Sequence, residues 1–434
     1  MTDSQLPVAV IGAGPVGLAA AAHLASRGIE PVVFEAGDSV GASVREWGHV
    51  RVFSPWGYNL DPVAAELLER TGWSPPPADV YPTGDEIVDR YLEPLAAAPG
   101  IAESLHLGAR VVAVTRLGVD KLKDSGRDDA PYLLVVEQDG EQRRYLARAV
   151  IDASGTWTRP NPIGAGGVPA AGERRHARRI AYGIPDVLGS ARERYAGRRV
   201  LVIGSGHSAF NAILDLVALR DSEPATEIVW AIRGDAPDRS YGGGDDDRLP
   251  ARGALGATVR GLVADGSVEV IAGFHTRAIA AEDGRLVVDD GERRLLGDEI
   301  IAATGFRPDL DLLRELRLEL DDRVEAPRAL APLIDPNLHS CGSVPPHGVD
   351  ELSHTDAGIY IVGMKSYGRA PTFLLRTGYE QVRSVVAALA GDWESARNVE
   401  LVLPETGVCS ANRDAAEAAC CGTDSPLLEI QTPA

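Results

Sequence analysis

A short apolar run followed at once by a glycine-rich turn occurs twice in this chain, and this repetition constrains the fold more than any other feature. The first copy is the run 8–11, VAVI, then the turn 12–17, GAGPVG, an alanine-rich stretch to Arg27 and a second apolar run ending at Glu35. The second copy is the run 199–203, RVLVI, then GSGHSA, a helical stretch over 210–219 and the run 227–232. Each copy predicts a strand, a helix and a parallel strand.

The glycines of the first turn have a chemical reading. Gly12, Gly14 and Gly17 let the backbone turn tightly and approach a pyrophosphate, and Pro15 suits the first turn of the helix that follows. The free N–H groups and the dipole at that helix N-terminus favour anionic oxygens. Glu35 ends the next strand, where its carboxylate can accept hydrogen bonds from a ribose. The first turn therefore predicts a dinucleotide site.

The second turn predicts a second dinucleotide site with a different preference. Gly204, Ser205, Gly206, His207 and Ser208 form its fingerprint, and alanine takes the third small position. The following strand ends at Arg233 and has no acid at the ribose position. A carboxylate would repel a 2′-phosphate, whereas arginine can pair with it, so this site favours NADP over NAD. An arginine that is merely solvated at a strand end is the alternative.

The length and the spacing of the two copies predict duplicated domains. The chain has 434 residues, which suits two or three domains, and the copies begin about 190 residues apart, too far for a solenoid repeat. We therefore expect an α/β protein with two Rossmann-like dinucleotide-binding units. Further helices are expected over 62–70, 83–98 and 372–390; further strands over 109–115, 131–137, 144–151, 267–271, 276–280, 285–288, 295–302 and 358–363; and a connection between domains over 158–172.

Charge and composition exclude several function classes. The chain has 43 Lys+Arg against 63 Asp+Glu, a formal charge of −20, which opposes nucleic acid and anionic membranes as partners. The N-terminus has neither a basic region nor a cleavage site, so we expect a cytoplasmic protein. The four cysteines, Cys341, Cys409, Cys420 and Cys421, cannot form a disulfide framework over this length.

Over residues 7–390 the chain resembles the flavoproteins with two dinucleotide-binding domains. The two glycine turns, the segment 303–308 (ATGFRP) after the second unit and the segment 152–155 (DASG) after the first look like the motifs of that family, in the same order. The segment 358–363, GIYIVG, is similar to the strand that closes over the flavin in relatives. The resemblance implies an FAD domain over 1–160 and 301–390, an inserted NADPH domain over 161–300, and a tail over 391–434 that we expect to be extended.

Within that family the chain is most similar to the flavin-containing monooxygenases. This resemblance implies that NADPH reduces FAD and that a C4a-peroxyflavin formed with O2 oxygenates a soft heteroatom or carbonyl of a small-molecule substrate. The chain departs from the branch in three places. The stretch 170–180 keeps the glycine and His176 of the branch motif but loses both aromatics, His207 replaces an asparagine, and no aspartate follows the strand at Met364.

The resemblance also assigns residues to the cofactors. The loop after the first unit offers Arg45, Trp47, Arg51 and Ser54 as FAD contacts, and structural packing is an equal alternative for the tryptophan. Further cofactor contacts are expected at Val112, Ala153, Ser154, Gly155, Thr304, Gly305 and Gly363. No general acid or base is obvious. His176, His207, Lys365 and Arg369 are candidates, with Lys365 or Arg369 expected to face the cleft near the flavin.

The cysteines leave two alternatives open. Pyridine-nucleotide disulfide reductases need a cysteine pair in the FAD or the NADPH domain, and the stretches 41–56 and 200–300 have none. Cys409 and the vicinal pair Cys420 and Cys421 resemble the C-terminal cysteines of mercuric reductases, so a flavin-dependent reductase or oxidase of a captured metal(loid) or thiol is the second hypothesis. Tail thiols that have no function, or that form an adventitious disulfide, are the alternative reading of these cysteines. A redox-sensing interaction protein is the third. The sequence does not fix the oligomeric state, and a homodimer is compatible with it.

Overall fold

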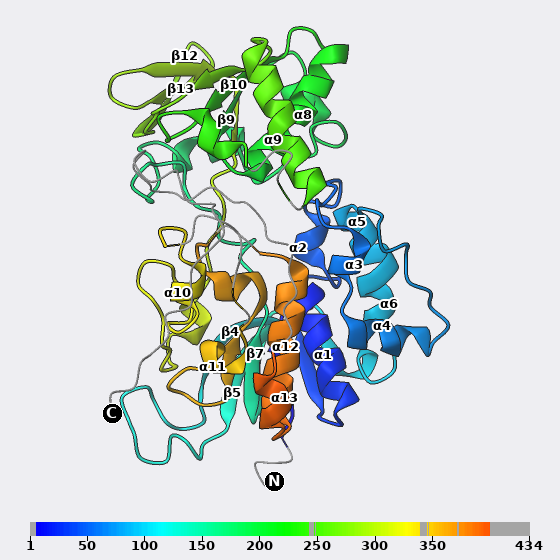
Figure 1. Cartoon of the computed structure of the whole chain (residues 1–434). Coiled ribbons are helices and arrows are strands. Elements are labelled where there is room, and N and C mark those ends of the chain that lie inside the picture. Colours follow the sequence, from blue (N-terminus) through cyan, green and yellow to red (C-terminus); the bar gives the residue numbers. More distant parts are fainter. Residues whose placement is uncertain are drawn as a thin grey trace, which may run out of the picture.

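Two parallel sheets, one above the other in Figure 1, organise the molecule. The computed structural model describes residues 6–242, 247, 249–338, 345, 347–370 and 373–399. The predicted α/β fold with two Rossmann-like units is confirmed. Within the described residues, no helix is long and apolar enough to cross a membrane.

The first unit is a three-layer arrangement around a five-stranded parallel sheet. Its strand order is β16-β7-β1-β2-β3, with bounds Ile359–Ile361, Ala149–Asp152, Val8–Ile11, Pro31–Phe34 and Leu105–His106. One face, with Val8 and Val10, packs on helices α1 (Pro15–Ser26) and α12 (Leu375–Leu389). The other face, with Ala9 and Ile11, packs on an antiparallel sheet of β4 (Arg110–Arg116), β5 (Tyr132–Gln138) and β6 (Glu141–Ala147). Covering on both faces explains why β1 and β2 are entirely apolar and why β7 is apolar up to its last residue, Asp152.

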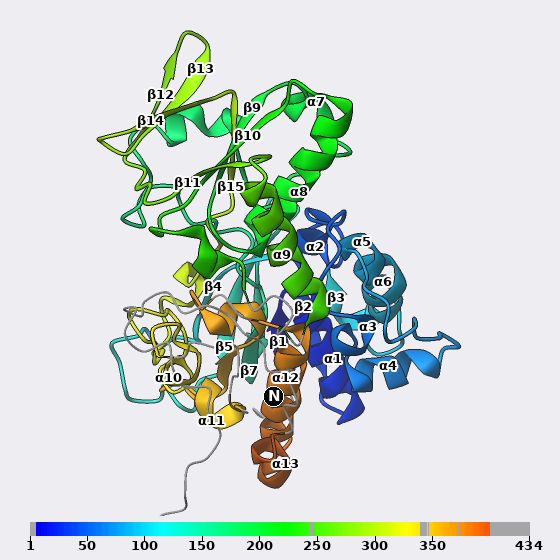
Figure 2. The same ribbon diagram turned by 45° about the horizontal axis from the view of Figure 1, so that its top comes forward.

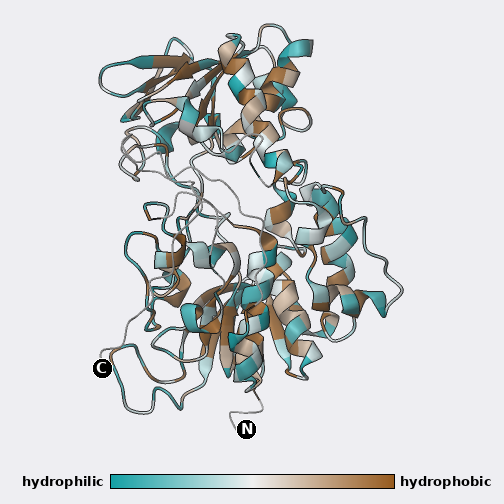
Figure 3. Cartoon of the chain, in the orientation of Figure 1, coloured by the Kyte–Doolittle hydropathy of each residue, from teal (hydrophilic) through white to brown (hydrophobic). Residues whose placement is uncertain are grey.

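The second unit repeats this layering. Its parallel sheet has the order β11-β10-β9-β15-β8, with bounds Glu269–Ile271, Glu227–Ala231, Arg199–Ile203, Glu299–Ala302 and Ile180–Tyr182. Helices α8 (His207–Ser222) and α9 (Pro250–Ala264) cover one face, and the antiparallel strands β12 (Ala278–Glu282), β13 (Arg285–Asp289) and β14 (Arg294–Gly297) cover the other. Figure 3 shows the hydrophobic residues gathered on the sheets and on the helix faces that meet them.

The two units are joined by two chain segments that run antiparallel to each other. Pro160 bridges Phe306, Asn161 N donates to Gly305 O at 2.9 Å, and Arg307 N donates to Arg159 O at 3.0 Å. Trp157 stacks on Phe306 with ring centroids 4.5 Å apart. Figure 2 shows both segments passing between the upper and lower sheets. The connection is therefore a paired ribbon and not two independent linkers.

The other helices are short and lie mostly in the first unit. They are α2 (Ala42–Arg45), α3 (Trp56–Asn59), α4 (Pro62–Glu69), α5 (Gly84–Ile87), α6 (Glu93–Ala96), α7 (Arg192–Tyr195), α10 (Ala331–Ile334), α11 (Val349–Leu352) and α13 (Trp393–Arg397). The helix expected over 83–98 is α5 and α6 joined by a π-helical turn, Val88–Leu92.

Three expectations are corrected. The run 144–151 is two strands in different sheets, broken at Arg148, whose N–H donates to Pro7 O instead of continuing the ladder. The run 295–302 is likewise broken at Asp298, whose carboxylate accepts from Arg199 N at 2.8 Å. The start of the tail is not extended, because α13 packs on α12 and buries Ala396.

Candidate functional site

The first glycine turn is pressed against the segment that follows β7. Gly12 has φ +98°, and a Cβ there would lie 2.8 Å from Ala153 O and 3.0 Å from the Cα of Ser154. A Cβ at Gly17 would overlap the carbonyl of Gly12. Gly14 differs, because a Cβ there would meet nothing within 4 Å. Gly12 and Gly17 are thus required by packing, whereas Gly14 faces open space at the N-terminus of α1.

Glu35 braces this turn from the neighbouring strand. Its carboxylate accepts from Ala13 N at 2.7 Å through Oε2 and from Gly37 N at 2.8 Å through Oε1. Each carboxylate oxygen has a further lone pair, so the same group can still accept from a ribose hydroxyl. The α1 N-terminus, with Gly14 as its N-cap, has no side-chain cap.

The second glycine turn repeats the geometry of the first. Gly204 has φ +136°, and a Cβ there would overlap the carbonyl of Ala303, which follows β15 as Ala153 follows β7. Gly206 faces open space, and the α8 N-terminus has no side-chain cap. Trp230 donates its indole N–H to Gly204 O at 2.7 Å. This buried tryptophan braces the second turn as a donor, whereas Glu35 braces the first turn as an acceptor.

These observations test whether the two sites fit dinucleotides. In each unit, one glycine is forced by the close approach of two backbones, and the next leaves an open space in front of an uncapped helix N-terminus. That space and those free N–H groups suit a pyrophosphate. The residues present therefore fit the pyrophosphate of FAD in the first unit and of NADPH in the second.

His207 opens α8 and lies between the two units. Its ring is 5.5 Å from the ring of Phe53 in the first unit and 5.8 Å from that of Phe210. Burial and then the charge of Arg252 lower the pKa of His207 to about 4, against a smaller opposing effect of Asp247. His207 is therefore neutral at neutral pH, which argues against a role as a cationic acid.

Two carboxylates of the second unit, Asp186 and Asp215, interact electrostatically. Burial, and then the charge of Asp186, raise the pKa of Asp215 to about 6. Asp186 itself has a lowered pKa, mainly because Ser190 N and then its hydroxyl donate to it, although burial opposes this. The charge of His49, from the first unit, also lowers the pKa of Asp186.

The four expected FAD contacts of the loop 45–54 are held by other groups. Arg45 binds the carboxylates of Asp85, Asp89 and Glu93. Arg51 is exposed and donates to Tyr81 O. Trp47 packs on Gly84, and Ser54 Oγ donates to Asn59 Oδ1 at 2.9 Å. Their assignment to FAD stays a prediction, and these partners show a scaffold role for each.

The remaining predicted cofactor residues lie on the sheets and crossovers. Val112 sits at a bulge in β4, where the pairing with β5 shifts register. Gly155 has φ +68° and Gly305 has φ +79°, and Thr304 Oγ1 donates to Asn161 O at 2.6 Å. Gly363, with φ +68°, donates its N–H to Gln381 Oε1 at 2.8 Å. Ser205 lies in the second turn, Ser208 lies in the first turn of α8, and exposed Arg233 follows β10.

The catalytic candidates are not brought together. Lys365 is fully buried, with its ammonium on Asp152, so it does not face a cleft as an open side chain. Arg369 is exposed. His176 lies on a 3₁₀ turn, Arg174–Arg179, before β8 at the amino edge of the second sheet, whereas the glycine turn follows the carboxyl end of β9. Sequence reasoning missed Asp152 as a partner of Lys365; a carboxylate closing a buried strand was the available signal.

Metal and thiol chemistry has no described site. No group of three or more histidine, cysteine, aspartate or glutamate residues that could hold a metal occurs within the described residues. Cys341, Cys409, Cys420 and Cys421 lie outside the described residues.

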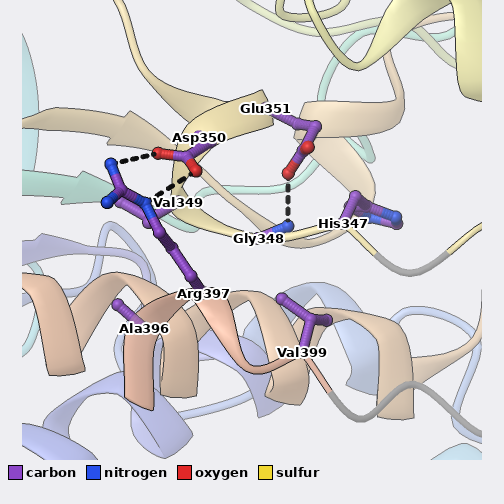
Figure 4. Close-up of a pocket in the computed structure, with 8 residues that line it drawn as sticks. All are labelled: His347, Gly348, Val349, Asp350, Glu351, Ala396, Arg397 and Val399. Atoms are coloured by element: carbon purple, nitrogen blue, oxygen red, sulfur yellow. Dashed lines mark hydrogen bonds and ion pairs between the residues drawn. The ribbon is translucent and has the colours of Figure 1, made fainter. Parts of the chain in front are cut away.

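A cavity of about 190 Å³ lies between α11 and α13 (Figure 4). The ion pair of Arg397 with Asp350 crosses its mouth, and Glu351 accepts from Gly348 N at 2.7 Å. Its lining residues are His347–Glu351, Ala396, Arg397 and Val399. None of them belongs to a glycine turn, so this cavity is not the candidate site.

Comparison with known proteins agrees with the two-site geometry. Residues 7–74 match the family described as FAD dependent oxidoreductase. Indole-3-pyruvate monooxygenase YUCCA1 of Oryza sativa subsp. japonica is 33% identical over 216 residues, 49% of this chain and 46% of that protein. Ferredoxin–NADP reductase 1 of Cupriavidus necator is 25% identical over 305 residues, 69% of this chain and 70% of that protein.

A solved structure extends the comparison to nearly the whole fold. The bacillithiol disulfide reductase of Bacillus cereus has a TM-score of 0.65 at 20% identity, covering 89% of this chain and 99% of that chain. Together the comparisons support the predicted cofactors, FAD and NADPH, and an enzyme of the flavin-dependent oxidoreductase kind. The chain spans about half the length of the first curated relatives it matches.

Proposed function

We propose that this protein is an NADPH-dependent flavin monooxygenase that oxygenates a soft heteroatom or a carbonyl of a small-molecule substrate. One observation carries the proposal. Two glycine turns of the same geometry each leave open space before an uncapped helix N-terminus, and the first 340 residues of the chain have no cysteine. Electrons from NADPH therefore meet no protein disulfide at either ordinary reductase position and pass to O2 and substrate. The similarity to a monooxygenase supports this choice.

The chain's own residues would bind and orient the cofactors. The Gly12 turn, with Glu35, would hold FAD in a domain over 1–160 and 301–390, and the Gly204 turn would hold NADPH in a domain over 161–300. Arg233 would pair with the 2′-phosphate. Bound FAD supplies hydride acceptance and reaction with oxygen. The protein's part is positioning and exclusion of water, and Phe53 and neutral His207 place two uncharged rings in contact between the units.

The test is NADPH oxidation by the FAD-loaded protein with and without O2. Monooxygenation predicts that turnover stops when O2 is removed and that one oxygen atom of labelled O2 enters the product of a sulfide or ketone probe. Undiminished anaerobic turnover with an added disulfide, mercurial or arsenical acceptor would favour the reductase alternative.

One variant separates these outcomes, and a second serves as a control. Cys420→Ser addresses the tail thiols and should leave NADPH oxidation unchanged if the proposal is right. Gly204→Ala should abolish flavin reduction in either case, and so it controls for NADPH oxidation that bypasses the second unit.

A further inference from the structure

A closed ring of charged and polar groups lies beneath the first glycine turn. Lys365 follows β16, and its side chain and that of Asp152 are both 0% exposed. Lys365 Nζ lies 2.6 Å from Asp152 Oδ2 and donates to Ser154 Oγ at 2.9 Å. Ser154 in turn donates to Asp152 Oδ1 from its hydroxyl at 2.6 Å and from its N–H at 3.1 Å.

The duplicated fold shows that this ring is not needed to build the unit. Asp152 ends β7 opposite Ile11 of β1, and Ala302 ends β15 opposite Ile203 of β9 in the same parallel register. An alanine therefore completes the second unit where the first has a buried carboxylate. Since burying an ion pair often costs as much as it returns, stability alone is a weak reason for its presence.

The ring lies at the edge of the sheet where the dinucleotide site is. Asp152 pairs with Ile11 on one side and with Ile361 of β16 on the other, so the carboxyl ends of three strands meet there. Ligands of open α/β sheets bind at this edge. Ser154 also forms the wall of the turn, because its Cα is 3.0 Å from the position of a Cβ at Gly12.

The charge of Lys365 reaches beyond its partner. Burial would raise the pKa of Asp309, but hydrogen bonds from Arg159 and the Asp311 N–H, and then the charges of Arg159 and Lys365, lower it overall. Asp309 belongs to the second connecting segment and Arg159 to the first. The charge of Lys365 therefore reaches a carboxylate of the second connecting segment.

We propose that Lys365, held by Asp152 and Ser154, balances the buried charge of Asp152 beneath bound FAD and so keeps that carboxylate from lowering the reduction potential of the flavin. Two-electron reduction adds negative charge to the isoalloxazine of a flavin. Charged groups of the protein near the isoalloxazine therefore tune the reduction potential. The ammonium favours the reduced form, the carboxylate opposes it, and together they nearly offset. The inference rests on FAD binding in the first unit and not on oxygenation.

The test measures the reduction potential of protein-bound FAD in three variants. Lys365→Met leaves the carboxylate alone and should lower the potential. Asp152→Asn leaves the ammonium alone and should raise it. Each shift should be at least tenfold in the ratio of reduced to oxidised flavin, about 30 mV for a two-electron couple. The double variant Lys365→Met/Asp152→Ala, which copies the second unit at Ala302, should return close to the wild-type value.

The controls separate charge from packing. Lys365→Arg keeps the charge and should shift the potential least among single variants. Arg127 and Asp356 form another buried pair, 2.5 Å apart, before the amino end of β16. Asp356→Asn should therefore lower thermal stability without moving the potential.

Shifts of the two single variants in the same direction, or no shift in either, would overturn the inference and leave the ring a structural clamp. If Lys365→Met fails to fold with FAD, Asp152→Asn and the double variant decide by the same criteria. Failure of the wild-type protein to bind FAD would instead refute the cofactor assignment itself.

Discussion

Replacing Gly206 by alanine separates the role of the second turn in binding from its role in folding. Gly206 has φ −93° and ψ 178°, a conformation open to alanine, and a Cβ there meets no protein atom within 4 Å. The fold should therefore accept the substitution within about 0.5 kcal/mol, as it accepts most substitutions in open surface positions. The added methyl group stands in the space through which the pyrophosphate of NADPH would approach the N-terminus of α8.

The expected loss is that of a charge-assisted hydrogen bond from the helix N-terminus to phosphate, about 1.5–3 kcal/mol. The dissociation constant for NADPH should rise roughly tenfold to a hundredfold, since each 1.4 kcal/mol is a factor of about ten. Anaerobic titration of the flavin absorbance with NADPH measures this constant. Thermal unfolding of the same samples measures the stability.

Gly204→Ala is the matched comparison. Its Cβ would overlap the carbonyl of Ala303, and φ of +136° is strained for any residue with a side chain, so this variant should lose several kcal/mol of stability. Equal stability losses in both variants, or an unchanged NADPH constant in Gly206→Ala, would refute the assignment of the open space to a pyrophosphate.

Three further outcomes follow from the charges. Arg233→Ala should raise KM for NADPH by tenfold or more and leave KM for NADH nearly unchanged, which steady-state kinetics with both nucleotides would show. Burial raises the pKa of Asp215 to about 6, so the charged form of this residue destabilises the folded protein at neutral pH. Asp215→Asn should therefore stabilise the protein by up to about 3 kcal/mol at pH 7, and this gain should fade as the pH decreases towards 4. Urea unfolding at several pH values would measure the gain. The pKa of His207 is lowered from 6.5 to about 4, so the unfolded chain takes up this proton at a higher pH than the folded protein does. The folded protein therefore loses stability as the pH decreases from 6.5 to about 4. His207→Gln should remove this part of the loss, which denaturation curves at several pH values would show.

The sequence was sufficient for the features that depend on local pattern. A buried apolar run, a glycine turn and a helix occur in both units. This pattern is typical of a Rossmann-like unit, so it was enough to predict the fold of each. The sequence positions of Glu35 and Arg233 likewise place an acid after the second strand of the first unit and a base after the corresponding strand of the second unit. The burial of β1 and β9 confirms that these apolar runs are buried strands.

The sequence was insufficient where a contact between distant segments decides the structure. The run 144–151, RYLARAVI, has no glycine or proline, yet it divides at Arg148 because the following residues join a different sheet. Lys365 was expected to face the cleft, and its partner lies more than two hundred residues earlier in the chain, at Asp152. Spacing along the sequence carries no signal for such a pair, because parallel strands bring together residues from separate parts of the chain.

The central claim is that the two turns hold FAD and NADPH so that one reduces the other, and anaerobic titration of the purified, FAD-loaded protein tests it most directly. The account predicts that one equivalent of NADPH bleaches one equivalent of bound flavin. A protein that retains no FAD, or whose flavin stays oxidised with excess NADPH, would contradict it.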